Sequence, residues 1–472
     1  MTELNKRRWL SILEFPELEK TARSLLQKYQ VPGCIIALAR DGEIVYEHSF
    51  GYRDTENEAP IDIDTVFGLA SLTKSFTCAA IMHLAEEGIL SLQDPIADYL
   101  PLIRESKQDW LHRITIHHLM THTSGLPPLA TLDEAMMRKE NHAHKPDYGE
   151  FPDHPESLAT YEELIDYLLE LHLTPLAEPG TLFSYSNEGY SLLGAIITNV
   201  SGQSYEQYVI DTIIKPAGLE RTGFRTDVEN NNQNVTTGYE KHEPTGVIYP
   251  VEDWWDAPSM RASGFLKSTA RDMLRYADAY IESRNKNTFL TEKNSETMTS
   301  PLVRRDAFKN YGYGFEIYES SFDTKMISHG GSLSSISSNF AILPYEGVAA
   351  IILTNLSGFP ASRLMQMMIQ VFFNKQLFES TPALEPLEVS KEIMRTYVGS
   401  YSSAEGMDCH FQINEAGKTE FWFQEEKYPF LFIDENTLVV TIDDTNEPVE
   451  FLKNKHGNVW ALSIFHRVIL KQ

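Results

Sequence analysis

The residues best placed to do chemistry are a serine and a lysine, Ser71 and Lys74, in the stretch FGLASLTKSFTCAAIMHLAEEG (residues 67–88). Apolar residues recur at helical spacing after Ser71, so we expect a buried helix from Ser71 to about Glu87. Residues three apart share a helix face, which would place the Lys74 amine within proton-transfer range of the Ser71 hydroxyl. The positive end of the helix would also stabilise negative charge developing there. Ser71 is therefore a candidate nucleophile.

The alternative, non-catalytic interpretation of this pair is an ordinary helix-capping serine beside a solvated lysine. Ser-x-x-Lys arises by chance in long chains, and Ser283 to Lys286 matches it as well. The residues that accompany the pair must decide between the two interpretations.

Tyr185 and Asn187 lie in an expected turn, just before a long apolar helix that should begin near Glu188. A phenol and an amide two residues apart on a rigid loop can point into one cavity. A tyrosine packed on the core and an asparagine capping the next helix would explain the pattern equally well.

A third cluster, His329-Gly330-Gly331-Ser332, lies in a segment that we expect to be a strand. Paired glycines let the backbone approach a ligand closely, and an N–H group in such a strand can donate to an oxyanion. The alternative is a glycine bulge.

Two further histidines, His118 and His122, are four residues apart and could share a metal ion. No third ligand with metal spacing stands nearby, and a histidine near a helix end often caps carbonyl groups. We therefore predict no metal site.

The elements expected to position these residues combine helices with one sheet. Asp41-Gly42 is a strong two-residue hairpin pattern between two apolar runs. Of the three late strands, the last is nearly all apolar and should be central. We expect helices at 15–29, 114–125 and 161–171, hairpin strands at 33–40 and 43–50, and strands at 311–319, 325–344 and 347–358.

Composition limits the classes of partner. The 472 residues are 42% hydrophobic and carry a net charge of −27, which fits a folded protein and disfavours nucleic acid or an anionic membrane as a partner. Three scattered cysteines indicate neither a disulfide framework nor a zinc site. The N-terminus does not read as a secretory signal and no run reaches transmembrane length, so we expect a cytoplasmic protein.

The chain changes character after Asn374. The segment KQLFESTPALEPLEVSKE has linker composition, and from Tyr397 to Gln472 short alternating runs are separated by turn residues. We predict two domains, residues 1–378 and 388–472, the second an antiparallel β-barrel or sandwich of about eight strands.

The order Ser71-x-x-Lys74, Tyr185-x-Asn187 and His329-Gly-Gly331 resembles the serine β-lactamase and penicillin-binding-protein superfamily, in its class C-like branch. ITIHHLMTHTSGLP, EPGTLFSYSNEGYSLLG and YGYGF add to the resemblance, which covers roughly residues 20 to 375. It implies an α+β fold, with an antiparallel sheet made from both ends of the domain, flanking helices and a helical subdomain. The C-terminal part resembles the lipocalin-like barrel appended to some peptidases of this superfamily.

The resemblance also implies roles for the site residues. Ser71 would attack a carbonyl and become acylated, Lys74 would ease removal of its proton, and Tyr185 would relay that proton and later activate water. Asn187 would hold the substrate amide and the Lys74 ammonium, and the backbone N–H groups of Ser71 and Ser332 would form the oxyanion hole. No metal or organic cofactor is implied.

The third motif departs from the Lys-Thr-Gly usual in β-lactamases and penicillin-binding enzymes. His329 is largely neutral near pH 7, unlike a lysine that attracts a substrate carboxylate. His-x-Gly resembles instead the D-aminopeptidases, related peptidases and some esterases. We expect a serine hydrolase of small peptides, amides or esters.

Other functions stay open. They are a penicillin-binding sensor that is acylated but hardly turns over, and a weak β-lactamase. An α/β-hydrolase is disfavoured because no Gly-x-Ser-x-Gly elbow follows a strand. The partner expected is a small molecule or short peptide, and a homo-oligomer is left open.

Overall fold

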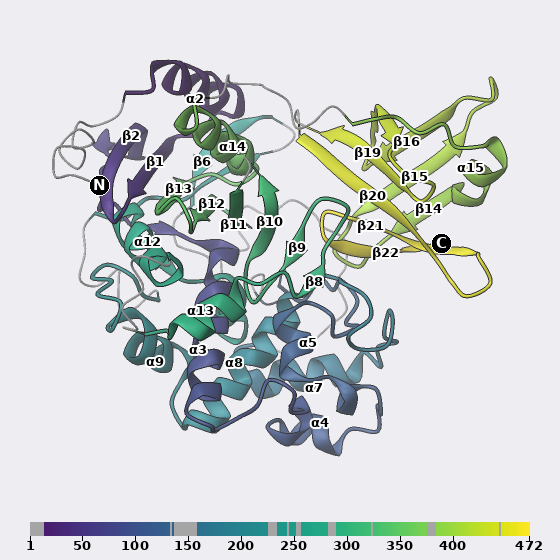
Figure 1. The fold of residues 1–472 in the computed structure, drawn as a ribbon, viewed down its shortest axis with the longest axis horizontal. Coiled ribbons are helices and arrows are strands. Elements are labelled where there is room, and N and C mark those ends of the chain that lie inside the picture. Colours follow the sequence, from purple (N-terminus) through teal and green to yellow (C-terminus); the bar gives the residue numbers. More distant parts are fainter. Residues whose placement is uncertain are drawn as a thin grey trace. The chain divides into compact units, whose positions relative to one another are not determined.

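The structure is a computed structural model that describes residues 14–132, 135, 158–224, 234–242, 245–251, 256–281, 289–321, 324–374, 384–442 and 445–472. The chain folds as two compact units. Figure 1 labels the helices and strands along the chain. The first takes in Met1–Leu92, Tyr190–Leu302 and Tyr311–Glu379, and the second takes in Gln93–Gly189, Val303–Asn310 and Ser380–Gln472. The predicted division at residues 378–388 stays a prediction.

The strands that organise the first unit follow the order β3-β2-β1-β13-β12-β11-β10 in their sheet. Strand β13 lies between β12 and β1 and is buried along its whole length, which confirms the prediction that it is central. These strands are β1 (Gly33–Arg40), β2 (Glu43–Asp54), β3 (Ala59–Pro60), β10 (Glu316–Ser321), β11 (Thr324–Leu333), β12 (Ile336–Leu343) and β13 (Val348–Thr354), and the short strands β8 (Val303–Arg304) and β9 (Asn310–Tyr311) precede β10 in the chain.

The predicted hairpin between β1 and β2 is confirmed. Asp41 and Gly42 connect the strands, and both have positive φ, as a two-residue turn with the twist of the sheet requires. Such a turn joins neighbouring strands without further residues, so the local sequence was sufficient to predict it.

One expected strand, 325–344, was wrong because it is two strands. The chain reverses after Leu333, which pairs with Ile336 across the turn. Ser335 takes a φ of 66°, a left-handed conformation that favours glycine. The sequence has serine there, so no turn pattern marks the reversal.

Helices cover the sheet of the first unit. Helices α2 (Pro16–Tyr29) and α14 (Ala361–Phe372) share a hydrophobic core with the strands. Helix α12 (Ala270–Tyr276) also contacts β1 and β13. The remaining elements are β4 (Phe67–Gly68), η2 (Ala70–Leu72), α3 (Thr73–Glu86), α9 (Tyr205–Val209), η6 (Ile210–Ile214), β5 (Tyr239–His242), β6 (Val247–Pro250), η7 (Pro258–Met260), α11 (Arg261–Gly264), β7 (Lys267–Ser268), η8 (Ala277–Tyr280) and α13 (Glu292–Met298).

The second unit begins with short helices. They are η3 (Ile96–Asp98), α4 (Pro101–Glu105), η4 (Leu111–Arg113), α5 (Ile116–Met120) and α7 (Tyr161–Glu170), and α8 (Asn187–Ser201) starts at its boundary. Helix α5 is shorter than the predicted 114–125, because Thr115 caps its start and His122 takes a φ of 57° just after its end. Helix α7 confirms the prediction for 161–171.

The C-terminal part of the second unit is a nearly closed β-barrel, which confirms the predicted all-β domain. Its nine strands run in the order β17-β16-β15-β14-β22-β21-β20-β19-β18, beside helix α15 (Lys391–Tyr397). The barrel has its own hydrophobic core, centred on Tyr397, Phe411 and Phe451. The strands are β14 (Gly399–Ser402), β15 (Asp408–Ile413), β16 (Thr419–Phe423), β17 (Glu426–Tyr428), β18 (Phe430–Phe432), β19 (Thr437–Ile442), β20 (Thr445–Lys453), β21 (Val459–Ile464) and β22 (Arg467–Lys471).

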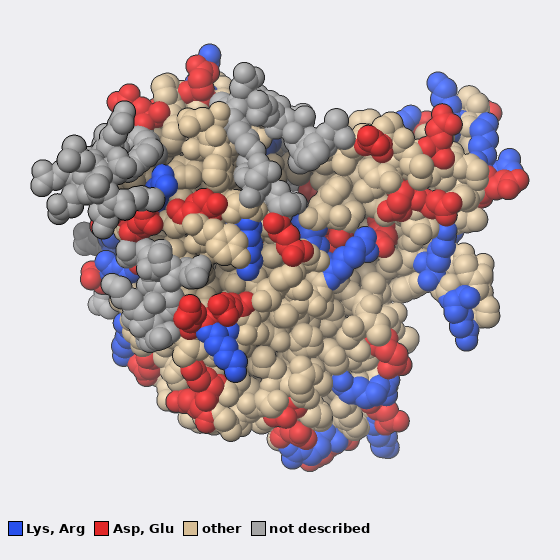
Figure 2. Space-filling model, in the orientation of Figure 1, with Lys and Arg blue, Asp and Glu red and all other residues tan. Residues whose placement is uncertain are grey.

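The surface reflects the acidic composition. On the face drawn in Figure 2, acidic side chains are numerous, and lysines and arginines are scattered among them. In the part of the chain that the structure describes, no helix is both long and apolar enough to span a membrane.

Candidate active site

Ser71 lies in the short turn η2, directly before α3. The α-helix expected from Ser71 thus begins two residues later, at Thr73. Ala70 has a φ of 49°, which is strained for a residue with a Cβ. The Thr73 hydroxyl donates to the Ala70 carbonyl at 2.7 Å and accepts from the backbone N–H of Leu266 at 3.1 Å. These two bonds hold the strained turn in place.

Lys74 is the direct partner of Ser71. Its Nζ donates to Ser71 Oγ at 3.3 Å and to the Ser263 carbonyl oxygen at 2.6 Å. The lysine is fully buried and its Nζ lies 5.4 Å from the ring centroid of Tyr190. A cation held against a hydroxyl favours the oxyanion that forms when the hydroxyl loses its proton. The Ser71–Lys74 pair can therefore act as a nucleophile and its activating group.

The second glycine of the third motif, Gly331, lets strand β11 lie against the Ser71 turn. A Cβ at Gly331 would lie 2.5 Å from the Leu69 carbonyl oxygen and 3.1 Å from Ala70 Cβ. The hydroxyl of Ser338 on β12 donates to the same Leu69 carbonyl at 2.8 Å. Gly331 is therefore required by a close backbone approach, and the first unit brings the first and third motifs together.

The Gly330 and Ser332 positions lie where β11 extends past its neighbour. The described pairing of β10 with β11 runs only from Thr324 to Ser328, so residues 329–333 lie beyond it. Ser332, which is exposed, is paired on the other side with Ser337 of β12. The segment can thus present its backbone beside the Ser71 turn, as the predicted oxyanion hole requires.

His329 is buried, and both of its ring nitrogens have close neighbours. Nε2 lies 3.1 Å from the Tyr311 hydroxyl and Nδ1 lies 2.6 Å from the Gly330 carbonyl oxygen. A neutral ring with its proton on Nδ1 satisfies both contacts, because Nδ1 then donates and Nε2 accepts.

Tyr185 is held in the second unit by His122. The imidazole stacks on the Tyr185 ring with centroids 4.2 Å apart, and its Nδ1 accepts the backbone N–H of Ser186 at 3.1 Å. The His122 carbonyl accepts the backbone N–H of Ser184 at 2.9 Å. His122 therefore supports the loop of residues 184–187, which we call the tyrosine loop. No local sequence pattern connects His122 with Tyr185, because their contact depends on the fold.

Arg467, at the start of β22, is a second neighbour of Tyr185 that sequence reasoning missed. Its guanidinium carbon lies 4.5 Å from the Tyr185 ring centroid. The same guanidinium forms an ion pair with Glu405, with Nε 2.8 Å from Oε2. No local motif marks this arginine.

Asn187 is the first residue of α8, and the neighbouring Glu188 is buried. The Ser186 hydroxyl donates to Glu188 Oε2 at 2.9 Å and accepts the backbone N–H of Gly189 at 3.0 Å. Burial raises the pKa of Glu188 to about 7, and the negative charge of Glu405 adds to the rise. The predicted start of this helix near Glu188 is confirmed.

The comparison with known families covers most of the chain. The family model described as Beta-lactamase matches residues 18–368. The chain belongs to the beta-lactamase family.

Individual relatives agree with this membership. The chain is 26% identical over 369 residues to Protein flp of Staphylococcus aureus strain N315, covering 78% of this chain and 68% of that protein. It is 28% identical over 329 residues to Penicillin-binding protein 4* of Bacillus subtilis strain 168, covering 66% of each. The chain thus spans about two thirds of the length of these relatives.

A solved structure extends the similarity to the C-terminal barrel. The octameric penicillin-binding protein homologue from Pyrococcus abyssi has a TM-score of 0.70 and 26% identity, over 98% of this chain and 100% of that one. The resemblance to the β-lactamase and penicillin-binding-protein superfamily and the predicted α+β fold with an appended barrel are confirmed.

Within this beta-lactamase-family chain, His118 has a structural role. Its Nδ1 accepts the backbone N–H of Thr115 at 3.1 Å, and the Thr115 hydroxyl accepts the His118 N–H at 3.3 Å. This reciprocal cap starts α5. Among the described residues, no three histidine, cysteine, aspartate or glutamate side chains are grouped to hold a metal ion.

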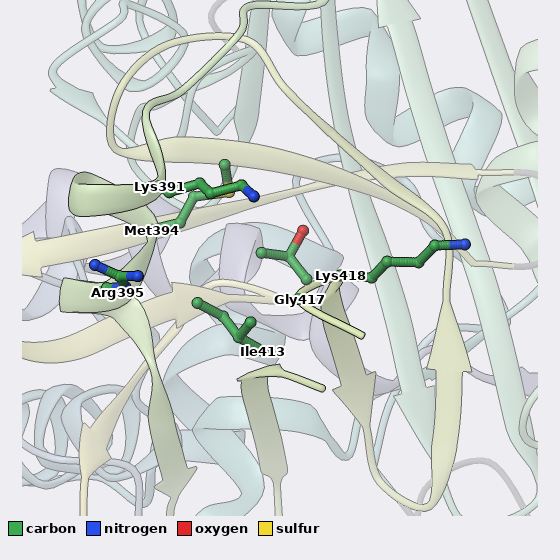
Figure 3. Close-up of a pocket in the computed structure, with 7 residues that line it drawn as sticks. Lys391, Met394, Arg395, Ile413, Gly417 and Lys418 are labelled. Carbon is green, nitrogen blue, oxygen red and sulfur yellow. The ribbon is translucent and has the colours of Figure 1, made fainter. Parts of the chain in front are cut away.

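A surface pocket in the barrel is lined by none of the predicted site residues. It has a volume of about 330 Å³. In Figure 3 the charged ends of Lys391, Arg395 and Lys418 lie well apart from one another, so they do not form one anion-binding group. The lining residues are Lys391, Met394, Arg395, Ile413, Gly417, Lys418 and Thr419.

Glu188→Gln is expected to stabilise the protein at alkaline pH. The folded-state pKa of about 7 lies above the ordinary 4.5, so the folded protein holds this proton more tightly than the unfolded chain does. The contribution of the Glu188 carboxyl group to the free energy of unfolding is complete below about pH 4.5 and falls as the pH rises to about 7. Above that pH the contribution is absent. The difference corresponds to roughly 3 kcal/mol of unfolding free energy. Glutamine keeps an acceptor for the Ser186 hydroxyl without the charge.

Thermal unfolding between pH 4.5 and 8.5 measures this effect. We expect the variant to melt roughly 2–4 °C above the wild type at pH 8 and to match it near pH 4.5. Glu170→Gln, at an exposed position of α7, is the control and should follow the wild type at every pH. A pH-independent difference between Glu188→Gln and the wild type would contradict the assignment.

Proposed function

We propose that this protein is a serine hydrolase that works through an acyl-enzyme on Ser71. The observation that carries the proposal is the 3.3 Å contact between the buried Lys74 amine and the Ser71 hydroxyl, in a strained turn beside strand β11. Relatives that include penicillin-binding proteins support the same chemistry.

In the proposed reaction, Ser71 Oγ forms a bond to the substrate carbonyl carbon as its proton passes to a base formed by Lys74 and Tyr185. The leaving amine or alcohol departs with that proton, which leaves the acyl group on Ser71. Water then attacks the ester, gives a proton to the same base, and releases the acid as Ser71 regains its hydrogen. No metal or organic cofactor takes part.

The other proposed roles follow the family pattern. Asn187 binds the substrate amide, and the backbone N–H groups of Ser71 and Ser332 stabilise the oxyanion. Gly330 and Gly331 leave room for the substrate to approach β11. These assignments stay predictions.

We propose small peptides or amides as substrates, with esters as the second class. His329 supports this choice, because its contacts with Tyr311 and Gly330 suit a neutral ring that offers no fixed positive charge to a β-lactam carboxylate. The cytoplasmic location stays a prediction. The octameric state of the Pyrococcus abyssi homologue supports a homo-oligomer as a proposal.

A second candidate is a penicillin-binding sensor that is acylated and hardly turns over. The relative named Penicillin-binding protein 4* favours keeping it. Intact-protein mass spectrometry after mixing with a fluorophosphonate or a penicillin, together with turnover of a nitrophenyl ester and a D-alanine anilide, separates the two. Adducts with turnover support the hydrolase, whereas a lasting penicillin adduct without turnover supports the sensor.

His329→Lys is expected to raise the rate of β-lactam acylation roughly tenfold. A lysine at this position adds a fixed cation for the substrate carboxylate, and a tenfold rate increase corresponds to about 1.4 kcal/mol of attraction. The measurement is the second-order rate of penicillin adduct formation.

His410→Lys adds the same charge at an exposed barrel position and serves as the control. Thermal melting checks that the buried substitution leaves the protein folded. An unchanged acylation rate in folded His329→Lys would show that the third motif does not set β-lactam reactivity.

A further inference from the structure

The tip of a barrel hairpin is hydrogen-bonded to the tyrosine loop within the second unit. The hairpin joins β21 to β22 through Phe465 and His466, which have φ values of 46° and 71°. The His466 carbonyl accepts the backbone N–H of Tyr185 at 2.8 Å. The backbone N–H of Val468 donates to the Ser184 hydroxyl at 3.4 Å. The hairpin is thus attached on both sides of Arg467.

Arg467 is a charged group held over the tyrosine ring. Its Nε lies 2.8 Å and its Nη2 lies 3.4 Å from the two Glu405 carboxylate oxygens, so the guanidinium has a fixed orientation. Burial lowers the pKa of Arg467, but the negative charge of Glu405 and its hydrogen bonds with the guanidinium outweigh this effect and raise it overall. The guanidinium therefore keeps its charge 4.5 Å from the Tyr185 ring centroid.

The other charged and titratable groups around Tyr185 come from three elements. His122, after α5, uses Nδ1 as an acceptor and stacks on the ring. His466 has its ring centroid 6.2 Å away, and its Nε2 lies 2.6 Å from a nitrogen of Arg305. Glu188 on α8 is buried near Arg467 and Glu405. Of these groups, Arg467 is the one whose cation is placed over the phenol ring.

We propose that Arg467 is a positioning residue for Tyr185, by which the C-terminal barrel fixes the phenol ring and favours its deprotonated form. The inference rests on the proposed function, in which Tyr185 accepts the Ser71 proton. A cation over an aromatic ring is attractive, and a positive charge nearby lowers the free energy of the phenolate more than that of the phenol. The barrel is then part of the catalytic apparatus through this one hairpin.

The test compares Arg467→Met, Arg467→Lys and Lys471→Met in the full-length protein. Lys471 is the matched control, because it lies on the same strand with its Nζ 5.7 Å from the ring centroid of another tyrosine, Tyr401. The measurements are kcat and KM for a nitrophenyl ester from pH 5 to 10, with thermal melting of each variant. Each kinetic series uses one ester with a free carboxylate and one without.

We expect Arg467→Met to move the rising limb of the kcat profile to higher pH by about one unit and to lower kcat near pH 7 roughly tenfold. KM should change little for either ester. Arg467→Lys should recover most of the rate, and Lys471→Met should match the wild type.

Three outcomes would overturn the inference. They are a wild-type pH profile in Arg467→Met, a loss of kcat without a pH shift, and a KM increase confined to the ester with a carboxylate. The last would mean that Arg467 binds substrate. Absence of any Ser71 adduct in the wild type would instead refute the proposed function, so the two failures are distinguishable.

Discussion

Ser71→Ala is expected to abolish both the fluorophosphonate adduct and all measurable turnover, a loss of at least about 10³-fold. Alanine keeps the turn and the helix that follows, but it removes the oxygen that would carry the acyl group. Lys74 keeps its bond to the Ser263 carbonyl, so the site stays folded. Intact-protein mass spectrometry and ester hydrolysis measure the two effects on one sample.

Ser75→Ala is the matched control for this variant. Ser75 is a buried serine in the first turn of α3, and its hydroxyl donates to the Leu72 carbonyl at 3.0 Å. Its loss should leave labelling at Ser71 intact. An adduct of the same mass on Ser71→Ala would show that another residue is the nucleophile and that Ser71 only shapes the turn.

Local patterns predicted the parts of the site that lie close in sequence. Ser71 and Lys74 were expected together because helical spacing relates them directly, and η2 with α3 preserves that relation. The Asp41-Gly42 hairpin was predictable for the same reason, because two residues determine it. In both cases the geometry follows from a few backbone angles.

Other parts of the site depend on contacts that no local pattern encodes. The hydrogen bond from Val468 to Ser184 joins residues 284 positions apart, and the Arg467 contact with Tyr185 depends on it. The position of the His122 ring depends on the left-handed backbone conformation that His122 itself takes after α5. Such contacts are set by packing, so they emerge only when the fold is known.

Residues with a strained, left-handed backbone conformation were also not predictable from local patterns. Ala70 and Ser335 both take positive φ without being glycine, and neither was expected from the sequence. Propensity favours glycine at such positions, so a residue with a Cβ is held there by its surroundings. At Ala70 these surroundings include Gly331, whose missing side chain leaves room for the turn. The glycine is in the sequence pattern, but the strain that it accommodates is not.

Tyr185→Phe is the second large effect we expect, a fall of roughly 10²- to 10³-fold in the rate at which the acyl-enzyme is hydrolysed. Phenylalanine keeps the ring, and with it the stacking on His122 and the cation of Arg467, while it removes only the hydroxyl. The variant should therefore fold normally and still be labelled at Ser71, more slowly than the wild type. Its acyl-enzyme should accumulate during ester hydrolysis and be visible by time-resolved mass spectrometry.

The control for this variant is Tyr401→Phe in the barrel, whose hydroxyl donates to the Tyr397 carbonyl at 2.6 Å. It removes a buried tyrosine hydroxyl that has no proposed role in the reaction. If Tyr185→Phe hydrolysed its acyl-enzyme as fast as this control, Lys74 would have to accept the proton of the attacking water without the phenol. Arg467 would then have no catalytic group to act through, so this measurement also limits what the barrel can contribute to the reaction.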